Sequence, residues 1–337
     1  MLNNYTPNNR LRVGYIGLGN HALENLLPSI LLTPELQLQI ISTRDVNKLN
    51  FFATKFNPKL ITTNWHNVIN SELVDLVVVS AIPEIHYEVA KKCLESDIHI
   101  FIEKPPTQNL SQLRDLLTLK KESNVKTFVG YNFSFSDSYN KLLEVVNKQS
   151  LKLAKFRFIA GKMNQPMDGF ATVLESCLYK LFIHPVHTLF KTFGSYKSLE
   201  ISEQIFDDKK FSMQVYFTFK NGETALIDWG NYSNRFECRF ELTNQLGETG
   251  ILDNMGKFEF WNMKNHTFDS SLFKNKERLV FDNSPLLGGF ERTGYQREFE
   301  LLAKSIIENK PSDCELEQSL EVYRAIEEIV YKSQIEF

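Results

Sequence analysis

An apolar run that ends in a glycine-rich turn constrains this chain more than any other segment. Residues 11–16 are strand-like, and Gly17–Ala22, Gly-Leu-Gly-Asn-His-Ala, follows directly before a helical pattern. In such a turn Gly17 permits the tight bend, Gly19 lets the backbone approach a pyrophosphate, and the small alanine lets helix and strand pack closely. The phosphates would meet the unpaired N–H groups at the start of the helix. The segment therefore predicts a dinucleotide-binding turn.

Composition and charge exclude several classes of protein. The 337 residues are enough for two domains, and 42% hydrophobic with 23% charged residues is ordinary for a globular chain. A net charge of −3 gives no basic surface for nucleic acid or an anionic membrane. No apolar run reaches the ~18 residues of a membrane-spanning helix, and the N-terminus lacks the features of a signal peptide. Because the cysteines lack metal-ligand spacing, we expect buried thiols and a cytoplasmic location for Cys93, Cys177, Cys238 and Cys314.

Two different patterns of apolar residues occur along the chain. Up to about residue 131, short Val/Ile/Leu-rich strands alternate with helical patterns, which predicts a doubly wound parallel sheet. The expected strands are 11–17, 38–43, 73–80, 98–103 and 125–131, and the expected helices are 22–32, 47–56, 84–96 and 111–123.

From about residue 151 to 290, residues alternate with period two. The strands 211–219 and 224–229 flank Asn221-Gly222, which is a strong hairpin signal. Further strands are expected at 235–243, 249–253, 257–261 and 278–281, with a helix at 172–193 and closing helices at 295–308 and 316–333. This part predicts a mainly antiparallel sheet in an α+β domain.

The end of the second predicted strand bears on the choice of cofactor. A carboxylate there accepts hydrogen bonds from a free ribose 2′-hydroxyl, whereas Thr43 and Arg44 offer a hydroxyl and a guanidinium that suit a 2′-phosphate. We therefore expect NADP to be preferred over NAD. If Asp45 occupies the ribose position instead, the preference reverses.

Two later strand ends carry polar residues on the same predicted edge. One strand ends at Ser80. Pro83 follows, which suits the first turn of a helix, and His86 lies just after it in that predicted helix. The next ends in Glu103-Lys104-Pro-Pro. A lysine near the nicotinamide would be a good hydrogen-bond donor to a reacting carbonyl or hydroxyl oxygen.

Together these segments resemble the Gfo/Idh/MocA group, the glucose–fructose oxidoreductase and inositol dehydrogenase family. The resemblance spans nearly the whole chain and depends most on the spacing of Glu-Lys-Pro from the glycine turn. It implies a Rossmann domain (residues 1–131), then a substrate and oligomerisation domain with an open sheet (132–337), the last helices packing back between them. It also implies NAD(P)-dependent hydride transfer at a sugar, cyclitol or sugar derivative. A homodimer or homotetramer through the open sheet would follow, with Lys104 as the active-site lysine.

The chain departs from the family on the predicted substrate helix. Where the family has D-x-G-x-H-x-x-D, this chain has Lys180, Phe182, His184 and His187 at the four defined positions. Helical spacing places 180, 184 and 187 on one face. Either the site binds an anionic substrate, such as an acidic, phosphorylated or nucleotide-linked sugar, or proton transfer falls to His184 alone, whose ordinary pKa of about 6.5 suits both directions.

The resulting hypothesis is an NAD(P)-dependent dehydrogenase or reductase acting on CH–OH groups, with Lys104 and His184 as catalytic residues. The alternatives are a non-catalytic NAD(P)-binding sensor of the same fold and a reductase of a non-sugar substrate. No metal ligand is expected. Substrate contacts are predicted for Lys180, His187 and Tyr295. Cofactor contacts are predicted for Gly17, Gly19, Asn20, His21, Thr43, Arg44, Ser80, Pro83, His86, Glu103 and Lys104.

Overall fold

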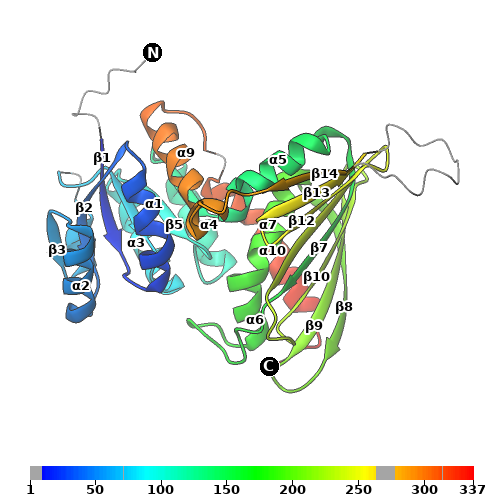
Figure 1. Ribbon diagram of the computed structural model, residues 1–337. Coiled ribbons are helices and arrows are strands. Elements are labelled where there is room, and N and C mark those ends of the chain that lie inside the picture. The colour runs from blue at the N-terminus through cyan, green and yellow to red at the C-terminus, as the bar shows by residue number, and fades with distance from the viewer. Residues whose placement is uncertain (1–9, 71, 263–277, 313) are drawn as a thin grey trace, which may run out of the picture. The chain divides into compact units, whose positions relative to one another are not determined.

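The structure is a computed structural model that describes residues 10–70, 72–262, 278–312 and 314–337. The chain forms two compact units, coloured by residue number in Figure 1. Unit 1 runs to Tyr131 and takes in residues 289–291 and 295–320 later in the chain; unit 2 comprises 132–288, 292–294 and 321–337. Among the described residues, no helix is both long and apolar enough to cross a membrane.

Unit 1 is built on a six-stranded parallel sheet. Its order is β3-β2-β1-β4-β5-β6, and each neighbouring pair runs parallel. The direction of strand order reverses between β1 and β4, and ligands of such sheets bind beyond the carboxyl ends of the strands at this point. The strands are β1 (Leu11–Ile16), β2 (Leu36–Ser42), β3 (Leu60–Thr62), β4 (Leu76–Val79), β5 (His99–Glu103) and β6 (Thr127–Gly130).

Five of these six strands match the predicted segments, and the doubly wound parallel sheet is confirmed. The four residues of β4 are completely buried, as an unbroken apolar strand covered on both faces requires. Strand β3 was not predicted, because it has three residues, two of them exposed, and so carries no apolar periodicity.

The helices of unit 1 follow the strand–helix alternation. Helix α9, from late in the chain, packs against α1 and β6 of this unit. The segments are the π-helical turn η1 (Ala22–Leu26), α1 (Leu27–Leu32), α2 (Val46–Phe56), the 3₁₀ turn η2 (Trp65–Val68), α3 (Pro83–Glu95), α4 (Leu110–Lys120), α9 (Tyr295–Ile307) and the 3₁₀ turn η7 (Leu316–Gln318).

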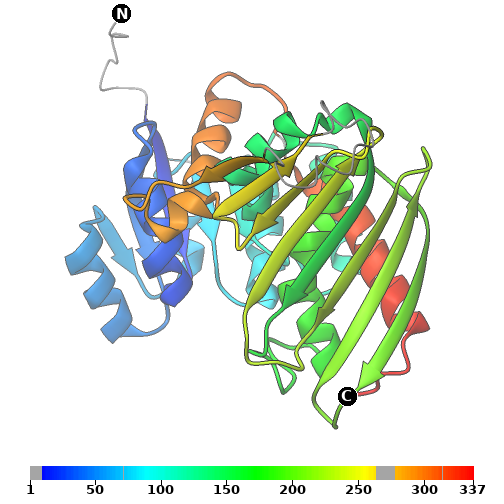
Figure 2. The ribbon, with the colours of Figure 1, turned by 45° about the vertical axis from the view of Figure 1, so that its right-hand side comes forward.

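Unit 2 contains an eight-stranded sheet, seen across its strands in Figure 2. Its order is β14-β13-β12-β11-β7-β10-β9-β8. All neighbouring pairs are antiparallel except β7 with β10, so the sheet is mainly antiparallel as predicted. The strands are β7 (Leu151–Ile159), β8 (Tyr196–Ile205), β9 (Phe211–Phe219), β10 (Thr224–Gly230), β11 (Glu237–Asn244), β12 (Thr249–Asp253), β13 (Lys257–Trp261) and β14 (Arg278–Asp282).

The two faces of this sheet differ in chemistry. One face is aromatic, with Phe156, Phe217 and Phe240 at most 2% exposed, and helices α5, α7 and α10 lie over it (Figure 1). The other face carries cross-strand ion pairs such as Lys155 with Glu241 at 3.2 Å. The remaining segments of the unit are the 3₁₀ turns η3 (Asn132–Phe135) and η4 (Lys148–Ser150), α5 (Asp137–Val145), α6 (Val173–Cys177), the π-helical turn η5 (Leu178–Phe182), α7 (Ile183–Phe193) and, from Glu321 on, α10 (Ser319–Lys332). The short helix α8 (Gly289–Arg292) belongs to unit 1 except for its last residue.

The predicted helix at 172–193 is a continuous helical run with a π-helical turn inside it. It begins in a capping box, where Thr172 accepts from the Glu175 N–H and Glu175 accepts in return. The π-helical turn η5 lies directly before His184. All four cysteines are buried thiols, as predicted.

Candidate functional site

The glycine turn of unit 1 leaves no room for a side chain at its first glycine. Gly17 has φ +97°, and a Cβ there would lie 2.7 Å from the Ala81 backbone nitrogen. The Ser80 hydroxyl donates to the Gly17 carbonyl at 2.9 Å, and the buried Tyr15 hydroxyl in turn donates to Ser80 at 2.7 Å. The loops after β1 and β4 are thus joined at the point where strand order reverses.

The second glycine has the opposite surroundings. A Cβ at Gly19 would meet no protein atom within 4 Å, so packing within the protein does not require a glycine there. Open space above the backbone suits the close approach of a pyrophosphate, and the first turn of the following helix leaves N–H groups that no helical carbonyl satisfies. The helix then continues through the π-helical turn η1, a feature frequent at functional sites. The residues present at this turn therefore fit a dinucleotide.

Lys104 follows the carboxyl end of β5 in the same unit. The Glu103 carboxylate before it is 5% exposed and accepts the Lys104 backbone N–H at 3.2 Å, and the Lys104–Pro105 peptide bond is cis. His86 is also buried, and its Nδ1 donates to the Pro105 carbonyl at 2.9 Å. Glu103 and His86 thus hold the backbone on both sides of the lysine side chain.

Glu103 also reaches the glycine turn. Its Oε1 lies 3.3 Å from His21 Nε2 and directly over Gly130, where an added Cβ would be 2.7 Å from the same oxygen. Burial raises the pKa of Glu103, but His21, through charge and hydrogen bonding, and then Lys104 and His86 more than offset this and hold that pKa below its usual range. The carboxylate is therefore ionised beside Lys104.

Tyr295 lies in unit 1, against this cluster. Its ring packs edge-on against the His21 ring with centroids 5.2 Å apart. Burial, together with Glu103 and Glu298, raises the pKa of Tyr295 well above its usual value, so its hydroxyl stays protonated. The sequence predicted a substrate contact here, and the structure places the residue beside the cofactor turn.

The end of β2 places Thr43, Arg44 and Asp45 in three different settings. The strand stops at Ser42, so Thr43 and Arg44 follow directly at its carboxyl end. Asp45 is the N-cap of α2, where its Oδ1 accepts from the backbone N–H groups of Asn47 at 3.0 Å and Lys48 at 3.1 Å. Its carboxylate is therefore engaged by the helix, while the Arg44 side chain is exposed.

In unit 2, His184 and His187 both face the turn η3. The His184 ring stacks on Phe133 with centroids 4.7 Å apart, and a 3.2 Å hydrogen bond joins His187 Nδ1 to the Ser134 hydroxyl. The His184 side chain is 7% exposed and His187 is 2% exposed. The helical spacing thus brings the two histidines to one face, as predicted.

The third member of the predicted trio has a partner of its own. Lys180, in η5, forms an ion pair and hydrogen bond with Asp168 from the loop before α6. Asp168 was not among the predicted site residues. The only local signal was the Asp-Gly turn at 168–169, which predicts a tight turn but not the partner of its side chain.

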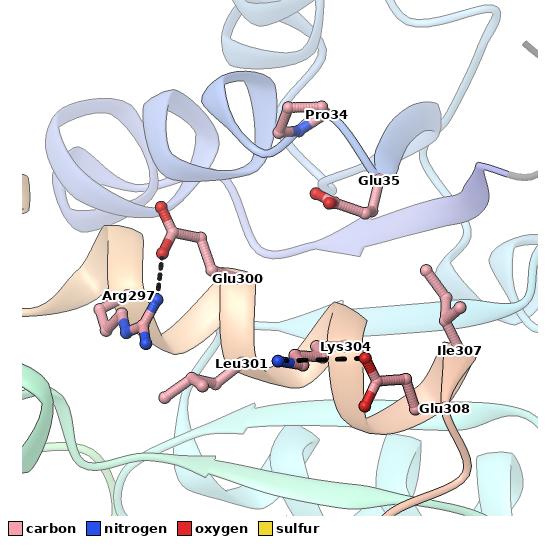
Figure 3. A pocket seen from close by; sticks show the side chains of 8 residues that line it. All are labelled: Pro34, Glu35, Arg297, Glu300, Leu301, Lys304, Ile307 and Glu308. Carbon is pink, nitrogen blue, oxygen red and sulfur yellow. Dashed lines mark hydrogen bonds and ion pairs between the residues drawn. The ribbon is translucent and has the colours of Figure 1, made fainter. Parts of the chain in front are cut away.

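A surface groove elsewhere in unit 1 lies away from these residues (Figure 3). Pro34 and Glu35 form one wall, directly before β2 begins. This is the amino end of the parallel sheet, opposite the edge where the glycine turn and Lys104 lie. The other wall, on α9 and the residue after it, includes Leu301, Ile307 and two ion pairs, Arg297 with Glu300 at 2.9 Å and Lys304 with Glu308 at 3.9 Å. Because it lies at the amino end of the sheet, we do not assign this groove to the candidate site.

Comparison with known proteins agrees with this geometry. Residues 11–131 match the model of the Gfo/Idh/MocA oxidoreductase family, described as having an NAD-binding Rossmann fold. Myo-inositol 2-dehydrogenase of Thermotoga maritima is 29% identical over 145 residues, 42% of each chain. The match thus spans less than half the length of that relative.

Solved structures resemble the whole chain. A dehydrogenase from Chromobacterium violaceum is similar with a TM-score of 0.89 and 24% identity, covering 97% of this chain and 96% of the other. Levoglucosan dehydrogenase in complex with NADH and levoglucosan is similar with a TM-score of 0.82 and 14% identity, covering 96% of each chain. At these identities the likeness establishes the fold. Residues 11–131, which contain the glycine turn and the Glu-Lys-Pro segment, are thus similar to the NAD-binding Rossmann domain of the Gfo/Idh/MocA oxidoreductase family, and the whole chain shares the fold of the solved dehydrogenases.

Proposed function

We propose that this protein is an NAD(P)-dependent dehydrogenase or reductase that interconverts a carbinol and a ketone on a sugar, cyclitol or sugar derivative. The observation that carries the proposal is the placement of Lys104. It follows the carboxyl end of β5, on the same sheet edge as the open glycine turn, and its backbone is held by the ionised Glu103. The substrates named for the inositol and levoglucosan dehydrogenases support a polyhydroxylated substrate.

The proposed chemistry divides between two side chains. Lys104 donates a hydrogen bond to the reacting oxygen and stabilises the negative charge that develops there. In oxidation His184 accepts the hydroxyl proton as the carbon loses a hydride; in reduction it returns that proton to the oxygen. Bound NAD(P) supplies the hydride acceptor or donor. The Phe133 ring under His184 keeps the imidazole in one orientation.

Incubation with NAD or NADP and a panel of sugars, inositols and sugar acids tests the proposal. We expect the absorbance of the reduced nicotinamide to rise with at least one polyol. Tight cofactor binding without turnover on any member, in either direction, would instead favour the non-catalytic sensor. Turnover confined to non-sugar carbonyl compounds would favour the third alternative.

We propose that Arg44 makes NADP the preferred cofactor. Its exposed guanidinium follows β2, and the Asp45 carboxylate is engaged as a helix cap. Arg44→Ala is expected to weaken NADP binding about tenfold or more, because hydrogen bonds to charged groups contribute about 1.5–3 kcal/mol, while NAD binding stays nearly unchanged. Titration of both cofactors measures this, with the exposed Lys48→Ala as the matched control. Equal weakening of both would contradict the assignment.

We also propose that two copies associate through the outer face of the eight-stranded sheet, as a homodimer or within a homotetramer. In the described residues no helix covers this face, and its charged side chains are aligned across strands. Arg157 lies 3.2 Å from both Asp228 and Glu237, and these carboxylates remain only partly exposed.

Burial of four thiols is consistent with the cytoplasmic location that we propose.

Sedimentation velocity tests the association. The unmodified protein is expected to sediment as a dimer or tetramer, and Arg157→Glu as a monomer, because the reversal places three carboxylates together on the face. Lys48→Glu, an exposed reversal on α2, is the control. A monomeric unmodified protein at micromolar concentration would exclude the assembly.

A further inference from the structure

The segment that carries His184 also carries a lysine whose charge is compensated. Lys180 lies four residues before His184, and the Asp168 carboxylate meets its ammonium. Both side chains are partly exposed, 22% for Lys180 and 25% for Asp168. The pair is therefore in reach of solvent, and of a ligand, while its net charge is zero.

The loop holds Asp168 in this position from both sides. Asp168 and Gly169 both have positive φ, 55° and 84°, and aspartate is among the few non-glycine residues that accept this conformation readily. Before the turn, the Met167 backbone N–H donates to the Ser176 hydroxyl at 3.0 Å. After it, Phe170 stacks on Tyr179 with centroids 5.0 Å apart and an interplanar angle of 6°.

Three consecutive contacts, from residues 167, 168 and 170, thus fasten the loop to one helical run at residues 176, 180 and 179. Asp168 therefore lies between two anchored residues of this loop.

We propose that Asp168 is a positioning residue that neutralises and orients Lys180, so that this site selects a neutral polyhydroxylated substrate over a carboxylate- or phosphate-bearing one. The inference rests on the proposed function and names its substrate class. A lone ammonium four residues from His184 would attract an anion. The neutral pair removes that attraction, and its carboxylate repels an anionic substrate.

The kinetic test compares a neutral and an acidic sugar of the same skeleton, such as glucose and glucuronate, on the holoenzyme. The unmodified protein is expected to prefer the neutral sugar. In Asp168→Asn, which accepts the same positive φ, KM for the acidic sugar is expected to fall about tenfold with kcat nearly unchanged, since a newly available charge-assisted hydrogen bond is of that size. Asp168→Glu should restore the original preference.

Two controls separate this effect from a structural one. Asp208→Asn removes an exposed aspartate of the same unit and should leave the ratio of KM values unchanged. Asp168→Asn combined with Lys180→Met should lose the gained affinity for the acidic sugar, because the ammonium is gone. A loop that merely supports the fold would change KM for both sugars alike, and that result would overturn the inference.

A binding experiment keeps the inference testable if no sugar is turned over. Calorimetric titration with gluconate as the probe should detect tighter binding, by about tenfold, to Asp168→Asn than to the unmodified protein. The Lys180→Met double variant should lose that gain. Absence of turnover with this pattern would reject the proposed function but retain the compensated pair. Equal binding of gluconate to all three proteins would overturn the inference that Asp168 neutralises Lys180. An unmodified enzyme that prefers the acidic sugar would overturn it as well.

Discussion

Replacing Lys104 with alanine is expected to lower kcat by about two to four orders of magnitude, the range typical of a positioned acid–base or electrostatic group. The reason is local. The Lys104 N–H is held by the Glu103 carboxylate and the next residue's carbonyl by His86, so the backbone direction of the side chain is set before any ligand arrives. Removing the ammonium leaves this backbone intact but removes the donor to the reacting oxygen.

Measuring cofactor affinity shows whether Lys104→Ala loses activity through its chemistry or because the fold is damaged. Fluorescence titration should give an NAD(P)H dissociation constant within about threefold of the unmodified protein, because the glycine turn is unaltered. Lys92→Ala, an exposed lysine on α3 of the same unit, is the matched control and should keep full activity. A Lys104→Ala enzyme with kcat within threefold of normal would remove Lys104 from the mechanism.

Alanine at Gly17 and alanine at Gly19 are expected to affect the free energy of unfolding differently. Gly17→Ala should lower the free energy of unfolding by about 1–3 kcal/mol, because φ is +97° and the new Cβ meets the Ala81 backbone at 2.7 Å. Gly19→Ala should change it by less than about 0.5 kcal/mol, because no protein atom lies within 4 Å of the new Cβ.

Both variants should nevertheless bind NAD(P)H at least tenfold more weakly. Gly17→Ala moves the turn itself, whereas Gly19→Ala places a methyl group where the pyrophosphate must approach. Urea unfolding and cofactor titration of the same samples measure the two effects. Normal cofactor affinity in Gly19→Ala would mean that the phosphates lie elsewhere, and an equal loss of stability in both would contradict the open surroundings of Gly19.

Local pattern was sufficient for most of the fold. The strand–helix alternation predicted the parallel sheet because burial on both faces requires unbroken apolar strands, and Asn221-Gly222 predicted the β9–β10 hairpin because its turn needs positive φ. Strand β8 was missed because an edge strand is largely exposed and has few apolar residues. Strand β7 was also missed, and its parallel pairing with β10 depends on how distant segments cross over, which no local pattern encodes.

Some features of the candidate site could likewise be predicted from local sequence, whereas others depended on tertiary structure. By itself, the sequence determined the glycine turn, the Glu-Lys-Pro segment and the alignment of His184 with His187, because each depends on neighbours within one turn or one helix. Tertiary structure decided what each charge meets. It joined Glu103 to His21, used Asp45 as a helix cap, and brought Asp168 to Lys180. An ionisable group acts through its net field and its free donors, and both depend on partners that folding brings from elsewhere in the chain.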